Sequence, residues 1–528
     1  MSSSPLLLLG DEAVARAALD AGISGVYAYP GTPSTEITEY IQQDPEAIAR
    51  NVHRKWCANE KTAMEEALGM SYAGKRALVC MKHVGLNVAA DPFINAAITG
   101  VGGGLVVAVA DDPSMHSSQN EQDSRFYAHF ASVPLLEPSS QQEAYEMVRA
   151  AFDYSEQLRL PVAVRLVTRL AHSRADVRTA PPRPENPLQP ASEPSRWVLL
   201  PVHARRNWAE LTARWPSITA ESATLPWNRL IPASDRRLGI VACGIAFNYL
   251  QELFPNECPY PVLKIGHYPI ATSILDDFRK AADAWLFLEE GAPFLEAQIR
   301  GPFSMSAFPV HGRLDGRLPR TGELSPDLVA QALGLPVPEG HPVPPLVAPR
   351  PPILCRGCPH ADTYDFIRDV MADYPGGRVF SDIGCYTLGA LPPYHAIHTC
   401  VDMGAAITMA KGAADAGLFP SLAVIGDSTF AHSGLTGLLD AIAENSPMTV
   451  IILDNETTGM TGGQESLARG RLESMVAGLG VAPDHLAVVT PLPRFRQDNA
   501  QRLRAEIAYR GVSVLIARRP CLHIRKGT

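Results

Sequence analysis

The 528-residue sequence is 46% hydrophobic and 19% charged, which is typical of an ordinary globular protein with room for several domains. Its formal net charge of −9 gives no support for nucleic acid or an anionic membrane as a partner. No apolar run approaches the roughly 20 residues of a membrane helix. Leu6–Leu9 runs into Asp11 with no basic residue before it, so a signal peptide is not predicted either, and we expect a cytoplasmic protein.

The first part of the chain, residues 1–180, alternates strand-like and helix-like segments, as a ligand-binding α/β domain does. Asn59 precedes a helix expected over residues 62–73, and Glu60 lies at its start. A first-turn glutamate after an asparagine cap stabilises the helix dipole, so Glu60 can be a purely structural residue. The strands are expected at residues 25–29, 77–81, 105–110 and 161–166.

Two Pro-rich stretches divide the rest of the chain. The first begins at residue 181, and we interpret residues 181–235 as a linker because no clear pattern follows the prolines. A second α/β block is expected over residues 236–334. A Pro-rich linker over residues 335–352 separates it from a last domain, residues 353–528. The predicted fold class is α/β throughout.

Residues 421–464 read as strand, turn, helix, strand and turn, with Ser433 expected to cap the helix. Such a unit forms a parallel, right-handed crossover, so Asp427 and Asn455 are expected at the carboxyl ends of two strands. Two oxygen ligands there suit Mg²⁺ with substrate phosphates. Gly426 is expected to allow a tight turn and a close approach of a phosphate, and the helix N-terminus to favour an anion. The alternative is an ordinary unit with a surface Asp and a turn Asn.

Five of the nine cysteines fall in the last domain, and four of them are candidate ligands: Cys355 and Cys358 form a CxxC, and Cys385 and Cys521 follow singly. Four thiolates suit Zn²⁺ or an iron–sulfur cluster, although a compact zinc ribbon usually shows a second CxxC. The alternative is that both single cysteines are buried apolar residues and the CxxC is redox-active or inert. The other cysteines lie in or near apolar runs and are expected in the core: Cys57, Cys80, Cys243, Cys258 and Cys400.

Gly426-Asp427-Ser428, followed by 26 residues and then Asn455, resembles the Mg²⁺-diphosphate signature of thiamine diphosphate (ThDP) enzymes. The resemblance implies that the Asp427 and Asn455 side chains and the Thr457 carbonyl bind Mg²⁺. It also implies that Gly426 and Ser428 contact the cofactor.

Together these motifs resemble the α subunit of indolepyruvate:ferredoxin oxidoreductase, in the 2-oxoacid:ferredoxin oxidoreductase superfamily. The resemblance implies a three-domain ThDP-enzyme architecture, with a pyrimidine-binding domain over residues 1–180, a transketolase-C-like domain over 236–334 and a diphosphate-binding domain over 353–528. It also implies one [4Fe-4S] cluster on Cys355, Cys358, Cys385 and Cys521. The matching segments are residues 29–34, 59–61, 82–87, 111–125, 355–360, 382–389 and 426–434.

The activity that this resemblance implies is oxidative decarboxylation of aryl 2-oxoacids, such as indolepyruvate or phenylpyruvate, to aryl-acetyl-CoA. Electrons are expected to pass through the cluster to ferredoxin or a partner β subunit, in an α dimer or an α₂β₂ complex. Glu60 matches the carboxyl group that hydrogen-bonds the aminopyrimidine ring in ThDP enzymes. His83 and His432, expected on loops, are candidates for moving protons, although either can be a structural histidine.

A non-oxidative 2-oxoacid decarboxylase or carboligase is the alternative, because it uses the same ThDP machinery and needs no cluster. A non-catalytic ThDP-binding subunit is disfavoured by Glu60, since binding alone does not need an activating carboxylate.

The end of the sequence departs from the family. The α subunit usually continues into a ferredoxin-like segment with two further clusters, whereas this sequence ends at Thr528, seven residues past Cys521. Two clusters need eight more cysteines, and only five others are present, all upstream. We therefore expect electrons to leave through another subunit or carrier.

Overall fold

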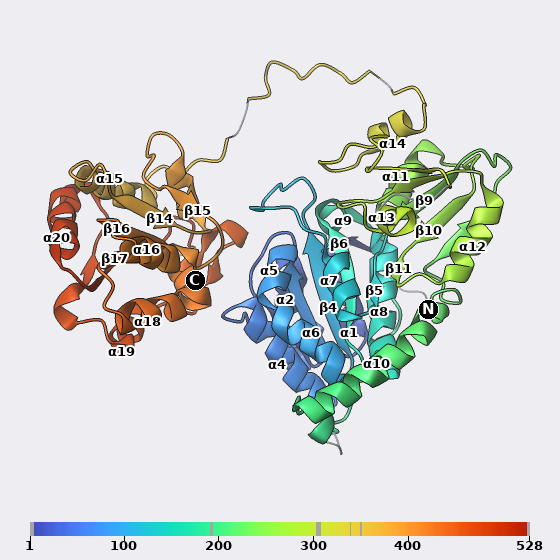
Figure 1. Cartoon of the computed structure of the whole chain (residues 1–528), viewed down its shortest axis with the longest axis horizontal. Coiled ribbons are helices and arrows are strands. Elements are labelled where there is room, and N and C mark those ends of the chain that lie inside the picture. Colours follow the sequence, from blue (N-terminus) through green and yellow to red (C-terminus); the bar gives the residue numbers. More distant parts are fainter. Residues whose placement is uncertain (1–4, 191–193, 302–307, 338, 349–350, 525–528) are drawn as a thin grey trace. The chain divides into compact units, whose positions relative to one another are not determined.

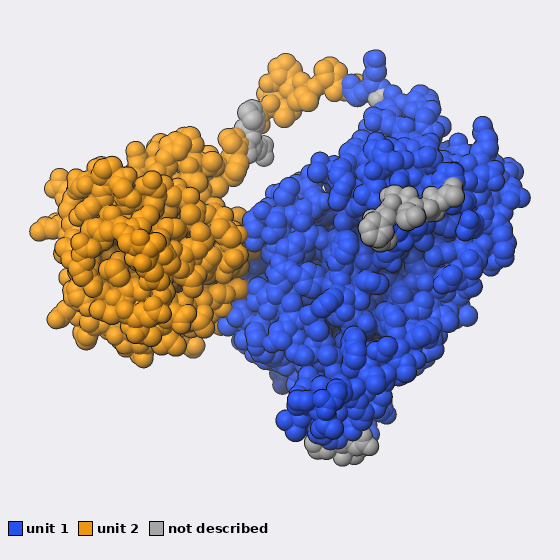
Figure 2. Space-filling model, viewed as in Figure 1, with its two compact units in different colours: residues 1–340 blue, residues 341–528 orange. Residues whose placement is uncertain are grey.

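The computed structural model describes residues 5–190, 194–301, 308–337, 339–348 and 351–524. The chain divides into two compact units, unit 1 (residues 1–340) and unit 2 (residues 341–528), which Figure 2 colours separately. Both are built on mainly parallel β-sheets flanked by helices, so the predicted α/β fold class is confirmed. Among the described helices, none is both long and apolar enough to cross a membrane.

The first sheet of unit 1 has six strands within the described residues, in the order β11-β5-β6-β4-β3-β2. Its neighbours are parallel except β11, which pairs antiparallel with β5. Successive side chains of a strand point to opposite faces. Leu78 and Cys80 therefore face one core, and Val79 and Met81 the other. The strands are β2 (Gly25–Ala28), β3 (Ala77–Lys82), β4 (Leu105–Asp111), β5 (Leu135–Leu136), β6 (Val162–Val167) and β11 (His267–Tyr268).

Helices cover both faces of this sheet (Figure 1). One face carries α1 (Gly10–Asp20), α2 (Thr35–Gln43) and α8 (Gln141–Leu158). The opposite face carries α4 (Glu60–Tyr72), α5 (His83–Val88) and α6 (Ala90–Thr99). Burial on both faces explains why a strand such as β4 is apolar along nearly its whole length. The loops that follow the strands gather at the carboxyl edge, where open α/β sheets bind ligands.

The second sheet of unit 1 has the order β13-β12-β9-β10-β8. It starts at Arg229, inside the range 181–235 that we interpreted as a linker. That range also holds the 21-residue helix α10 (Pro201–Glu221). Only Asn207, Leu211 and Ile218 of this helix are buried, which explains why its sequence shows so weak a pattern. The strands are β8 (Arg229–Ile231), β9 (Gly239–Cys243), β10 (Val262–Ile265), β12 (Trp285–Leu288) and β13 (Val310–His311).

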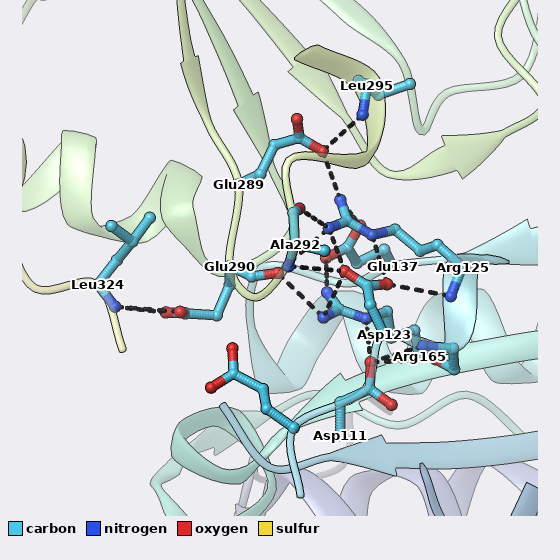
Figure 3. Close-up of polar contacts among 12 residues, drawn as sticks. Asp111, Asp123, Arg125, Glu137, Arg165, Glu289, Glu290, Ala292, Leu295 and Leu324 are labelled. Atoms are coloured by element: carbon cyan, nitrogen blue, oxygen red, sulfur yellow. Dashed lines mark hydrogen bonds and ion pairs between the residues drawn. The ribbon is translucent and has the colours of Figure 1, made fainter. Parts of the chain in front are cut away.

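A buried ionic network connects the two sheets of unit 1 (Figure 3). Arg125 Nη1 lies 2.8 Å from Glu289 Oε2, and its Nε lies 2.9 Å from Asp123 Oδ1. Arg165 Nε lies 2.6 Å from Asp111 Oδ2. Glu289 follows a strand of the second sheet, whereas Asp111 and Arg165 lie on strands of the first. Removing one partner would leave a buried charge unpaired, at a cost of about 3–5 kcal/mol.

Unit 2 holds one parallel sheet in the order β15-β14-β16-β17-β21-β20. Helices α15 (Pro359–Met371) and α20 (Arg496–Ala508) pack on one face, and α16 (Ala405–Asp415), α18 (Leu435–Ala443) and α19 (Leu472–Leu479) on the other. Between α14 (Pro326–Ala332) and α15, the described residues form no helix or strand. The strands are β14 (Arg378–Ser381), β15 (Thr399–Cys400), β16 (Ser421–Gly426), β17 (Met448–Asp454), β20 (Leu486–Val489) and β21 (Val512–Arg518).

The helical segment after β16 begins earlier than the sequence suggested. Helix α17 (Asp427–Thr429) starts directly at the end of the strand and continues through a π turn, Phe430–Gly434, into α18. Ser433 lies inside this π turn, so the prediction that Ser433 caps the helix is wrong. Asp427 itself occupies the first turn, where the unpaired N–H groups of a helix lie.

Candidate functional site

In unit 1, Glu60 is the first residue of α4. The Asn59 side chain accepts a hydrogen bond from the Thr62 backbone N–H at 2.9 Å, which caps the helix as expected. Glu60 is only 4% exposed. An added Cβ at Gly85 would lie 2.7 Å from Glu60 Cγ and Oε1, so the absence of a side chain at position 85 leaves room for this carboxyl group.

Lys82 ends β3, and His83 directly follows it. Burial lowers the pKa of Lys82, and the charges of Asp112 and Glu60 oppose this shift. His83 is the first residue of α5, so the expectation that it lies on a loop is wrong. Its Nε2 lies 3.1 Å from the Asn120 carbonyl oxygen, and its buried Nδ1 has no hydrogen-bond partner in the described part of the chain. Burial and the Lys82 charge lower the pKa of His83 to about 4, so the ring is neutral near pH 7. Nε2 then carries the proton and donates a hydrogen bond to the carbonyl oxygen, which leaves Nδ1 unprotonated, as an acceptor.

In unit 2, Asp427 and Asn455 follow two neighbouring strands. Strands β16 and β17 are parallel with Gly426 opposite Leu453, so both side chains lie just beyond the same sheet edge. Burial, more than the nearby Asp454 charge, raises the pKa of Asp427 to about 7. Asp427 Oδ2 is buried, and the described residues offer it no hydrogen-bond partner. A buried carboxylate oxygen without a partner is the kind of group that a cation stabilises.

The Asn455 amide points at two oxygen atoms. One end of this amide lies 3.0 Å from Asp427 Oδ1 and 2.9 Å from the Thr457 carbonyl oxygen. Glu456 has a positive φ of 64°, which turns the chain between Asn455 and Thr457. With nitrogen at that position the amide donates to both oxygens. With oxygen there, the amide oxygen lies about 3 Å from each of the other two oxygens, which is the spacing of adjacent ligands in octahedral Mg²⁺ with its bonds of about 2.1 Å.

Gly426 and Ser428 flank Asp427 in this loop. Gly426 has φ −76° and ψ 158°, which any residue can adopt, so the turn does not require a glycine, and the close approach of a phosphate stays a prediction. Its role is close packing, because an added Cβ would lie 2.7 Å from Tyr386 Cε1. The Ser428 hydroxyl accepts a hydrogen bond from Thr458 Oγ1 at 3.0 Å, which holds the loop after β17 against the loop after β16.

Three further histidine and aspartate side chains lie in unit 2 near this loop. His432 is buried in the π turn rather than on a loop, next to the Ser433 hydroxyl. His360, which the sequence analysis did not single out, places Nε2 3.4 Å from Asn455 Nδ2. Burial lowers the pKa of His360 to about 4. Burial also raises the pKa of Asp382 to about 8, and the Gly404 N–H donates to its Oδ2 at 3.1 Å. His360 lies two residues after Cys358, and Asp382 lies three residues before Cys385, so their closeness to cysteines was the available signal in the sequence.

Cys355, Cys358, Cys385 and Cys521 come together in unit 2. Burial, followed by the neighbouring thiols of the other three, raises the pKa of Cys385 to about 11. Cys358 also has its pKa raised by burial and then by Cys355 and Cys521. The Cys355 sulfur lies 3.3 Å from His523 Nε2.

The distances among these four sulfurs distinguish a single Zn²⁺ ion from a cubane iron–sulfur cluster. The ligands of one Zn²⁺ ion lie about 3.8 Å apart, because Zn–S bonds are about 2.3 Å long. Among the described residues, no three of these sulfurs form a group whose members all lie within 4.8 Å of one another. A cubane cluster spreads its sulfurs more widely, since each cysteine binds a different iron.

The remaining cysteines are mostly structural. Cys57, Cys80 and Cys243 are buried, as predicted, and Cys258 is half-buried. The prediction for Cys400 is wrong, because it is exposed at the end of the short edge strand β15.

Two family models match the chain, one in each unit. "Pyruvate flavodoxin/ferredoxin oxidoreductase, thiamine diP-bdg" matches residues 16–214. "Thiamine pyrophosphate enzyme, C-terminal TPP binding domain" matches residues 382–508. The first range contains Glu60, and the second contains Asp427, Asn455 and Thr457. The fold and these matches define a ThDP-binding 2-oxoacid oxidoreductase, an enzyme that decarboxylates 2-oxoacids oxidatively.

Curated relatives narrow this class to one family. The "Indolepyruvate oxidoreductase subunit IorA" of Archaeoglobus fulgidus is 37% identical, over 98% of this chain and 86% of the relative. The IorA subunit of Thermococcus kodakarensis is 36% identical over the same shares. The chain therefore belongs to the IorA family of oxidoreductase α subunits, as the sequence resemblance predicted.

A solved structure shares the fold. It is the 2-oxoglutarate:ferredoxin oxidoreductase from Magnetococcus marinus with 2-oxoglutarate, coenzyme A and succinyl-CoA bound. The TM-score is 0.51 at 14% identity, over 63% of this chain and 65% of that chain. At this identity the likeness concerns the fold alone. It agrees with the predicted ThDP-enzyme architecture, while the five residue ranges that we assigned to domains and linkers stay predictions.

Proposed function

We propose that the protein catalyses the ThDP-dependent oxidative decarboxylation of aryl 2-oxoacids such as indolepyruvate or phenylpyruvate. In this reaction the 2-oxoacid and CoA–SH yield the aryl-acetyl-CoA thioester, CO₂, one proton and two electrons. The observation that carries the proposal is family membership over nearly the whole chain, combined with the oxygen cluster of Asp427, Asn455 and Thr457. The aryl side chain of the substrate is inferred from the names of the relatives.

Asp427, Asn455 and Thr457 are proposed to hold Mg²⁺ and, through it, the diphosphate of ThDP. The unpartnered Asp427 Oδ2 and the convergence of three oxygen positions fit this role. A bound cation would stabilise the ionised form of Asp427, whose pKa burial raises to about 7. Gly426 and Ser428 would then line the same loop and contact the cofactor.

Bound ThDP supplies a carbon nucleophile that stores the electrons of the cleaved bond. Glu60 is proposed to hydrogen-bond the aminopyrimidine ring and so to set its basicity. Its near-complete burial at a helix N-terminus keeps water away from the carboxyl group. His83, whose ring is neutral and whose buried Nδ1 has no hydrogen-bond partner among the described residues, is the first candidate for moving protons. His432 is the second candidate for moving protons, in the helical turn after Asp427.

Cys355, Cys358, Cys385 and Cys521 are proposed to hold one [4Fe-4S] cluster that accepts the two electrons one at a time. The raised thiol pKa values oppose thiolates in the absence of a metal, and bound iron reverses this effect. We further propose that a β subunit completes the enzyme and that ferredoxin is the acceptor, as the names of the relatives and their class suggest.

The test uses enzyme purified anaerobically together with any subunit that co-purifies. Iron and sulfide are assayed first, and then CoA-dependent reduction of an artificial acceptor with indolepyruvate, phenylpyruvate, pyruvate and 2-oxoglutarate. We expect iron and sulfide near four of each per chain, and a clear kcat/KM preference for the two aryl substrates. A preference for pyruvate or 2-oxoglutarate would overturn the aryl assignment. CO₂ release without CoA or acceptor dependence would instead establish the non-oxidative alternative.

A further inference from the structure

A second cluster of potential metal ligands lies in unit 1, apart from the residues discussed above. It consists of Asp11 on α1, Glu36 on α2 and His172 at the end of α9 (Thr168–His172). One ligand atom from each side chain lies within 4.8 Å of the other two. The three helices follow β1 (Leu6–Leu9), β2 and β6, so segments far apart in the sequence supply the three groups.

Asp11 is the unusual member of this cluster. Its side chain is fully buried, and neither carboxylate oxygen has a hydrogen-bond partner among the residues that the structure describes. Nearby Glu12 does not compensate the charge of Asp11. Its Oε2 accepts a hydrogen bond from the Leu9 N–H at 2.8 Å, and its negative charge repels the Asp11 carboxylate. An ionised carboxylate in such a place is strongly unfavourable unless a cation compensates it. A buried polar group without a partner commonly marks an ion or water that the protein binds.

The other two ligands are accessible and already oriented toward each other. Glu36 Oε2 lies 3.5 Å from His172 Nε2, and the two side chains are 37% and 34% exposed. Burial first and the Glu36 charge second raise the pKa of Asp11, while the Glu36 contact raises the pKa of His172. The Glu36 carboxylate thus contacts the imidazole, whereas an Asp11 oxygen lies within 4.8 Å of both groups and has no hydrogen-bond partner among the described residues.

We propose that Asp11, Glu36 and His172 bind a divalent first-row transition-metal ion, for which Zn²⁺ is the probe. A mixed set of one imidazole and two carboxylates suits such ions, whereas Mg²⁺ and Ca²⁺ prefer oxygen ligands alone. The buried Asp11 forms the base of the site, and the exposed side next to His172 leaves positions for water.

This ion would tie three helices of unit 1 together near the carboxyl edge of the first sheet. Helix α2 begins directly after residues 29–34, and its Thr35 Oγ1 accepts from the Gly31 N–H at 3.1 Å. The ion therefore stabilises the start of the helix that carries this turn. The role is structural, and it is independent of the proposed reaction, because none of the three residues belongs to the proposed ThDP or cysteine sites.

The test measures bound Zn²⁺ per full-length chain after gel filtration, in excess Mg²⁺ and ThDP. We expect His172→Gln and Asp11→Asn each to bind one equivalent less than the unmodified protein. Zinc held elsewhere, for example by the four cysteines, contributes equally to all variants and cancels in this difference. The matched control is His311→Gln, since His311 pairs with Asp315 at 2.7 Å and has a similarly exposed side chain of 32%. It should retain the full zinc content.

Thermal unfolding gives an independent readout that does not depend on activity. Zn²⁺ should raise the midpoint of the unmodified protein and of His311→Gln by more than it raises the midpoint of the two ligand variants. Without metal, Asp11→Asn should unfold at the same or a higher temperature, because it removes a buried charge, and this result excludes misfolding as the cause of lost binding. Equal zinc content in His172→Gln and the unmodified protein, or equal zinc-induced shifts, would overturn the proposal and leave Asp11 as a protonated buried acid.

Discussion

The backbone N–H of Cys521 donates to the carbonyl oxygen of Asn455 at 3.0 Å. This bond joins the cysteine cluster directly to the loop whose side chain points at Asp427. The Gly459 backbone in the same loop lies close enough to Cys385 that an added Cβ would be 3.3 Å from its sulfur. The proposed cluster and the proposed diphosphate site therefore share one loop, so an electron would have a short path between them.

Cys521→Ser should remove the iron–sulfur absorbance and stop acceptor reduction while leaving ThDP bound. The reason is that the substitution removes a thiolate ligand but keeps the N–H that holds Asn455. Absorption spectroscopy and calorimetric ThDP titration check this under anaerobic conditions. Cys400→Ser, an exposed cysteine of the same unit, is the control and should keep its colour. Loss of ThDP affinity in Cys521→Ser would show that the side chain supports the loop itself.

Asp427→Asn should abolish Mg²⁺-dependent retention of ThDP. The amide is nearly isosteric with the buried carboxyl group but cannot offer two anionic oxygens to the cation. Calorimetry with ThDP and Mg²⁺ measures the effect, and the variant should be at least as stable as the unmodified protein without cofactor, because a buried acid is neutralised. Unchanged affinity would remove Asp427 from the metal site.

Glu60→Gln should leave ThDP binding within a few-fold of normal and remove most of kcat. The amide cannot share a proton with the aminopyrimidine ring as the carboxyl group does. The control is Glu65→Gln, one turn later on α4, where the side chain is 47% exposed beside Lys61. If kcat survives in Glu60→Gln within a few-fold, then Glu60 only caps the helix.

The local parts of the candidate sites were predictable because each depends on a short pattern at a strand end. Asp427 and Asn455 lie at the ends of apolar runs that form strands. Asn59 and Thr62 form a helix cap, and an asparagine directly before a helical segment is a recognisable cap pattern. The roles of His360 and Gly426 were not predictable, because they depend on contacts across the fold. His360 reaches Asn455 from the start of α15, and Gly426 makes room for the Tyr386 ring. The spacing of residues along the sequence does not reveal contacts between residues that are far apart in the chain.

Gly426→Ala should destabilise unit 2 by about 1–3 kcal/mol, because its Cβ would lie 2.7 Å from the Tyr386 ring. The matched substitution is Gly412→Ala in the interior of α16, where no other described heavy atom lies within 4 Å of the added Cβ, apart from its chain neighbours and its own helix backbone. It should stabilise the protein by roughly 0.5–1 kcal/mol, the ordinary helix propensity difference. Chemical unfolding compares the two, and equal effects would contradict the packing role assigned to Gly426.

Glu290→Gln should make the protein less sensitive to rising pH. Burial raises the pKa of Glu290 from its ordinary value of 4.5 to about 7, although the Leu324 N–H donates to it (Figure 3). The folded protein therefore holds this proton more tightly than the unfolded chain, and stability falls as pH rises from about 4.5 to 7. The difference amounts to about 3 kcal/mol at most. Unfolding measured at pH 5, 6, 7 and 8 should show the gap between variant and unmodified protein growing up to pH 7 and then staying constant.

Strand β11 lies in the second part of unit 1 by sequence but completes the first sheet by pairing with β5. A fragment that ended at residue 180 or 235 would therefore expose the two-residue strand β5 as an open sheet edge, where other chains can pair and aggregate. The same cut would leave Arg125 without Glu289. Residues 1–340, which form unit 1, keep this sheet and its buried charges together, so a division of the chain near residue 340 leaves this sheet edge paired.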